Sequence, residues 1–121
     1  MIVSATRIRN LTPHELNIEC FAGGTMTIPA DGQVARCETV HAPAHVLSVD
    51  GIDIAVANEA LGPVVDLPEP EVGVVLVVSR LVAEAVPHRA DVYAPGRAIR
   101  AYDGRIVGAK GLVRCPGIDG M

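Results

Sequence analysis

The sequence predicts a mainly β domain of the α+β type, a compact antiparallel barrel or sandwich with one short helix. Short apolar segments are separated by clusters of Gly and Pro throughout the chain, which is typical of a β-rich fold. Asp-Gly pairs at 50–51 and 103–104 lie between alternating segments and indicate two hairpins. Hydrophobic residues make up 50% of the chain, yet it has one Phe, two Tyr and no Trp, so aliphatic and largely β-branched side chains must fill the core.

The length and composition indicate a single domain over residues 1–121. A chain of 121 residues can bury a core without disulfides or a metal. Its 20% charged residues, set against the hydrophobic half, exclude a disordered protein.

Charge and cysteine usage exclude several classes of function. The net charge is −4, the ten cations are scattered and aromatic residues are almost absent, so no binding of polymeric nucleic acid is expected. The longest apolar run, 74–78, is too short to cross a bilayer, and the N-terminus lacks the apolar segment of a signal peptide. Cys20, Cys37 and Cys115 have no zinc-site spacing. The sequence therefore predicts free thiols, a cytoplasmic location, and no metal, cofactor or membrane partner.

In the first third of the chain, turn signals divide four expected strands. A strand is predicted over 1–8. Segments 16–21 and 25–28 flank Ala22-Gly23-Gly24 and predict a hairpin. A turn at 30–32 precedes a returning strand over 33–40.

The first Asp-Gly hairpin joins 46–49 to 52–56. A type I′ turn needs φ > 0 at both central residues, which Asp-Gly favours. That turn places Val49 opposite Ile52 and Leu47 opposite Ile54, giving one apolar face.

The second Asp-Gly hairpin joins 99–102 to 105–108 and is predicted with the same turn. Tyr102 then lies opposite Arg105, and Arg100 lies opposite Val107. Residues 58–61 are ambiguous, and the three prolines within 62–71 predict an irregular crossing.

One helix is predicted, over 79–86, directly after the buried strand 74–78. Ser79 is a suitable N-cap, and Arg80 and Glu84 form an i, i+4 pair. Leu81, together with Val82 and Ala85, is expected on the buried face.

The residues around this helix are the first candidate site. The backbone N–H groups at Ser79 and the cation of Arg80 suit an anion. His88, Arg89 and Asp91 lie at the other end of the helix, about 12 Å away, where they could flank an extended ligand. The alternative is a capped helix with Arg89 and Asp91 paired in solvent.

Two further clusters are candidates for ligand binding. Thr12 and His14 flank a proline in a tight turn and could present a hydroxyl and an imidazole to a ligand, or could only bond the local backbone. Arg100 and Tyr102, with Arg105, could seat a nucleotide, or could lie on a solvated strand face. His41 and His45 are four residues apart, but the proline between them argues against a helix and so against a metal site.

The motif Asn10-Leu11-Thr12-Pro13-His14 resembles a family of small proteins of phage and prophage genomes. The resemblance continues through most of the chain, in the segments 15–18, 28–29, 32, 34–36, 67–70, 78–85, 89–95 and 103–105. An apolar 74–76 departs from the family pattern, in which an aromatic is common. The resemblance implies an origin as a phage accessory protein, and such proteins commonly act on host defence or regulation.

Three functions follow from these expectations. The first is binding and sequestration, without chemistry, of a small phosphate-bearing ligand such as a nucleotide immune signal. The residues expected to line that site are Thr12, His14, Ser79, Arg80, Arg89, Arg100 and Tyr102. The second is an inhibitor that occludes a host protein by direct contact, and the third, with less support, is a hydrolase of a signalling nucleotide. A homo-oligomer, most simply a homodimer, is expected because hairpins leave edges to cover.

Overall fold

The computed structural model describes residues 1–121 and is mainly β, as the sequence predicts. About 51% of the chain is strand and 7% is helix, and one sheet is a nearly closed barrel. The elements in chain order are β1 (Arg7–Asn10), β2 (Leu16–Glu19), β3 (Thr25–Ile28), β4 (Arg36–Val49), β5 (Ile52–Val65), β6 (Val74–Val77), α1 (Arg80–Ala85), β7 (Val92–Arg100), β8 (Ile106–Val113) and a 3-10 turn, Ile118–Gly120.

Six strands form the body in the order β1-β6-β7-β8-β2-β3. Asn10 and Ala30 form a bridge that draws the two ends of this sheet together. The longest ladder of the body, β7–β8, is antiparallel, as is β2–β3. The β1–β6, β6–β7 and β2–β8 contacts are short and parallel. Strand β6 continues into α1 and returns as β7, which is the crossover that a parallel pair requires.

The core lies between this sheet and the helix. The apolar run predicted as a buried strand is β6, and Val77 and Val78 are fully buried. The main cluster contains Leu11, Ala35, Leu76, Val78, Val82, Ala83, Val92 and Ala94. Small aliphatic side chains therefore fill the interior, as the lack of aromatics predicts. The α-helix has six residues, and no helix of the structure could span a membrane.

Helix α1 lies where the sequence predicts, but its buried face differs from the prediction. The Ser79 hydroxyl accepts a hydrogen bond from the Val82 amide at 3.3 Å, and Arg80 pairs with Glu84 at 3.1 Å. The prediction that Leu81 is buried is wrong, because 49% of it is exposed. Val82 is buried as predicted, but Ala85 is exposed and Ala83 faces the core in its place. A six-residue helix has too few turns for an apolar period to fix its rotation.

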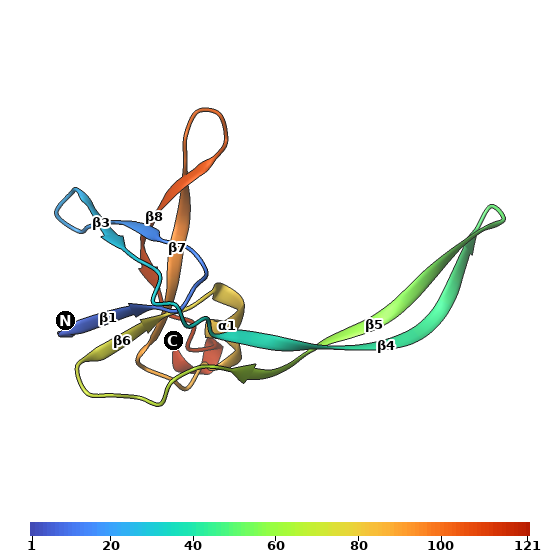
Figure 1. Cartoon of the computed structure of the whole chain (residues 1–121), viewed down its shortest axis with the longest axis horizontal. Coiled ribbons are helices and arrows are strands. Elements are labelled where there is room, and N and C mark those ends of the chain that lie inside the picture. Colours follow the sequence, from blue (N-terminus) through green and yellow to red (C-terminus); the bar gives the residue numbers. More distant parts are fainter.

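Strands β4 and β5 form a long two-stranded arm that leaves the body (Figure 1). Val49 lies opposite Ile52 and Leu47 opposite Ile54, so the predicted register is confirmed. Asp50 and Gly51 have φ of 50° and 78°, as a type I′ turn requires. Each strand has fourteen residues, so the arm includes most of the predicted strand 33–40 and the ambiguous segment 58–61.

Two predicted boundaries are wrong for the same physical reason, the position of a neighbouring strand. The first strand begins at Arg7 rather than at residue 1, because its pairing with β6 starts at Val74. The segment 62–71 was predicted to be irregular, but it is strand as far as Val65. The reason is that β4 pairs with β5 along its whole length, from Val49 opposite Ile52 to Arg36 opposite Val65.

The register predicted for the β7–β8 hairpin is also wrong. Ala101, not Tyr102, lies opposite Arg105, and the Ala101 amide donates to the Arg105 carbonyl at 2.8 Å. The loop has three residues, of which only Gly104 has positive φ, at 86°. Arg100 is paired with Ile106, so Arg100 and Arg105 lie on opposite faces.

Candidate binding surfaces

The outer half of the arm carries a mostly apolar face without Asp, Glu, Lys or Arg, here called the distal arm face. It consists of His45, Leu47, Val49, Ile52, Ile54 and Val56, which follow from the register and the alternation of a strand. About half of the Leu47, Val49 and Ile54 side chains (48% each) and 66% of Ile52 are exposed. No other element of the chain covers this face, as the course of the arm in Figure 1 indicates.

The opposite face of the arm is more polar. Ser48 lies opposite Asp53, and Val46 lies opposite Ala55. Nearer the body, the His41 Nδ1 is 3.0 Å from a carboxylate oxygen of Glu59. The two faces therefore differ in charge although both meet solvent.

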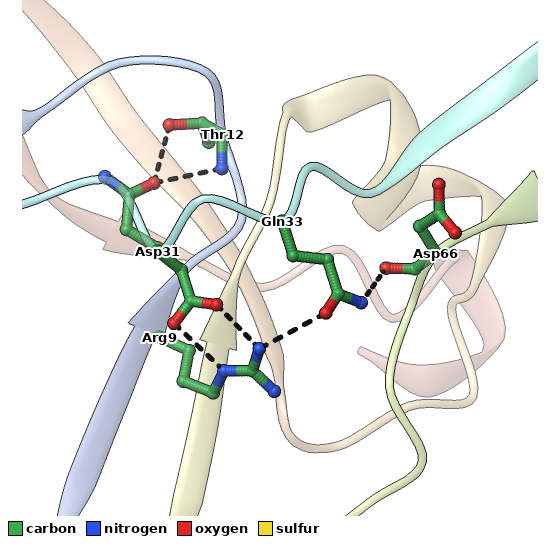
Figure 2. A network of polar contacts seen from close by, with 6 residues as sticks. Arg9, Thr12, Asp31, Gln33 and Asp66 are labelled. Carbon is green, nitrogen blue, oxygen red and sulfur yellow. Dashed lines mark hydrogen bonds and ion pairs between the residues drawn. The ribbon is translucent and has the colours of Figure 1, made fainter.

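Polar contacts fix the base of the arm to the body (Figure 2). Arg9 makes a two-bond ion pair with Asp31, at 3.2 and 2.6 Å, and lies 3.5 Å from the Gln33 side chain. The Gln33 amide donates to the Asp66 carbonyl at 2.8 Å, beyond the end of β5. Hydrogen bonding from Arg9 lowers the pKa of Asp31, so this carboxylate stays charged at neutral pH. Arg36 and Asp66 add an exposed pair at 2.7 Å.

A groove of about 520 Å³ lies between β2 and the β7–β8 hairpin. Leu16, Ile106 and Val107 contribute apolar surface, and Glu15 and Arg105 are its charged residues. This volume is within the usual range for a small-molecule site, about 300–1,000 Å³. One guanidinium beside one carboxylate makes the groove nearly neutral, which suits an uncharged ligand or one with a single phosphate better than a polyphosphate.

Thr12 and His14 belong to a buried network centred on Asn10. The Asn10 amide nitrogen donates to the carbonyls of His14 (2.8 Å) and Ile28 (3.1 Å), and its oxygen accepts from the Thr12 amide at 3.0 Å. The Thr12 hydroxyl lies 2.6 Å from the Asn10 oxygen and 3.0 Å from the His14 carbonyl. Figure 2 shows the Thr12 hydroxyl turned toward this network. His14 itself is exposed, as is Pro13.

Ser79 and Arg80 are exposed at the start of α1. The Ser79 hydroxyl caps the helix, and the Arg80 guanidinium is paired with Glu84. Six residues make fewer than two turns, so the dipole of this helix is small.

Arg89 is half-buried, and its guanidinium is bonded to groups of the same chain. Its guanidinium forms two hydrogen bonds with Asp91, at 2.8 and 2.9 Å, and donates to the Pro68 carbonyl at 2.9 Å. The hydrogen bonds from Arg89 lower the pKa of the Asp91 carboxyl. The Arg89–Asp91 pair that the sequence offers as an alternative to ligand binding is thus present, but both side chains are largely buried rather than in solvent.

Arg100 and Tyr102 lie at the end of the β7–β8 hairpin. Arg100 donates to the Gly104 carbonyl at 2.8 Å, and the Tyr102 side chain is fully exposed at the tip. The seven predicted ligand-binding residues thus occupy four separate places, and the only ones brought together are neighbours in the chain.

Two features of the structure were not predicted from the sequence. Asn10 organises the motif that begins with it, and an Asn in a turn commonly accepts a hydrogen bond from the backbone amide two residues on, as in an Asx turn. The sequence predicted one apolar face for the hairpin that forms the end of the arm, but it did not predict that this face is exposed. Comparisons of the chain with protein-family models, with curated proteins and with solved structures found no match.

Proposed function

We propose that this chain is a non-enzymatic accessory protein that acts by direct contact with other protein chains. The observation that carries the proposal is the exposed distal arm face. An isolated two-stranded hairpin is at best marginally stable in water, so an arm of this length needs a surface to pack against. Contiguous apolar surface on a soluble protein marks interaction sites.

The arrangement of the cations favours this function over sequestration of an anion. Arg80 and Arg89 are each paired with a carboxylate of the chain, and Arg100 bonds its own loop. A phosphate would have to compete with these partners, and these three arginines lie in separate places. On the phage origin that the motif implies, a host defence or regulatory protein would be a target for such contact.

Site-specific photo-cross-linking tests whether protein covers the arm. A benzophenone amino acid placed at Leu47 in producing cells should form a protein adduct, because this position is on the distal arm face. The matched control is the same group at Ser48, the next residue, on the opposite face. Equal or absent adducts at the two positions would contradict the proposal.

The groove supports a second candidate function, the binding of a nucleotide that places a single phosphate beside Arg105. Its volume and its single cation are the observations in favour. A mono-, di- or cyclic nucleotide present at 100 times its Kd would add about 2.7 kcal/mol of stability. This second function predicts a rise in melting temperature that Arg105→Ala removes and Arg80→Ala leaves intact. No shift with any nucleotide of the panel would end it.

A further inference from the structure

The accessible area of the chain shows how far it departs from a compact monomer. A compact monomer of 12.6 kDa exposes about 6,200 Å², whereas this chain exposes 8619 Å². The excess of about 2,400 Å², to which the arm and the end of the β7–β8 hairpin both contribute, is about three times the 800 Å² that each side of a standard interface buries. Such an amount is typical of chains that fold together with a permanent partner.

We infer that the occupant of the distal arm face is a second copy of this chain, packed face to face with its own distal arm face across a two-fold axis. This inference rests on the proposed function. A permanent partner has to be present whenever the chain folds. A second copy of the chain meets this requirement, because it is made wherever the first copy is made.

The charge pattern of the arm fits contact with itself. In a two-fold contact a residue meets the same surface patch of its partner, so a charged face would repel its copy. The distal arm face carries no Asp, Glu, Lys or Arg. The charged residues near the tip, Asp50 and Asp53, lie in the turn and on the opposite face.

The strand edges of the arm favour face-to-face packing over edge-to-edge pairing. Pro43 in β4 and Pro63 in β5 each lack the N–H that a neighbouring strand would need. The ladder is also irregular between Pro43 and His45 and between Cys37 and Thr39. Two ribbons stacked about 10 Å apart would interdigitate their aliphatic side chains as the two layers of a sandwich do.

Sedimentation equilibrium of the purified chain, with two single variants, tests the inference. The wild type should sediment with twice the mass of the 12.6 kDa chain. Ile54→Glu should raise the dimer Kd at least about 100-fold, because the added carboxylate would be buried without a partner. Ala55→Glu adds the same charge at the next residue, on the opposite face, and should change the Kd less than about 3-fold.

A wild-type chain that stays monomeric over a roughly 100-fold range of concentrations up to its solubility limit would overturn the inference. Equal weakening of the dimer by the two variants would also overturn it. If Ile54→Glu does not fold by circular dichroism, the purified chain with benzophenone at Leu47 decides. An adduct of two chains then supports the inference, and its absence overturns it. A monomeric chain whose Leu47 still cross-links to a different protein in cells would contradict the self-contact alone and leave the proposed function standing.

Discussion

Replacing Asn10 with Leu is expected to cost the body about 3 kcal/mol of unfolding free energy, because it removes a buried hydrogen-bonding centre. Asn10 is 1% exposed and its side chain bonds two carbonyls and the Thr12 amide. Leu is similar in volume but leaves these groups without partners inside the protein. Urea denaturation measures the loss.

The matched control for this prediction is Asn58→Leu. Asn58 is exposed on β5, and the same exchange there should alter the stability of the body by less than about 0.5 kcal/mol. Asn10→Asp should also destabilise, since an oxygen would then face the carbonyls of His14 and Ile28. A loss below about 1 kcal/mol for Asn10→Leu would show that the network is dispensable.

Gly96→Ala is expected to cost about 3 kcal/mol through overlap with the backbone of the neighbouring strand. A Cβ built at Gly96 would overlap the carbonyl oxygen of Lys110 and lie 3.0 Å from that of Gly111. Neither atom can move without disturbing the β7–β8 ladder. Thermal unfolding followed by circular dichroism measures the effect.

Gly62→Ala provides the comparison for this prediction. A Cβ at Gly62 meets its nearest neighbours, in Glu38, at 3.4 Å. The same added methyl group should therefore change stability by less than about 1 kcal/mol. A Gly96→Ala protein as stable as Gly62→Ala would mean that β7 and β8 separate more easily than the structure indicates.

Local signals in the sequence predicted the elements that depend only on near neighbours. The Asp50-Gly51 turn fixed the register of Leu47 with Ile54, because a type I′ turn admits one pairing. The Ser79 cap and the Arg80–Glu84 pair followed from spacing along one helix. The Asp103-Gly104 pair misled, because a three-residue loop uses a single positive φ, at Gly104, and shifts the register by one.

Long-range contacts decided what the sequence could not predict. An apolar face on a hairpin predicts that the face is buried, but it does not predict whether the same chain or another chain packs against it. Asn10 reaches the carbonyl of Ile28, eighteen positions away, through a closure of the barrel that no local pattern encodes. The predicted ligand-binding residues lie in four separate places because Ser79 precedes α1, Arg89 follows it and Arg100 ends β7, and no local pattern predicts how these segments pack.

Hydrogen exchange of the arm amides at two protein concentrations tests the central claim most directly. If a second copy covers the distal arm face, amides of β4 and β5 should be protected above the dimer Kd and should exchange faster on dilution below it. Amides of β6, in the core of the body, should exchange at one rate at both concentrations. Arm amides that exchange equally fast at both concentrations would contradict the account, because the arm would then stand alone in solution.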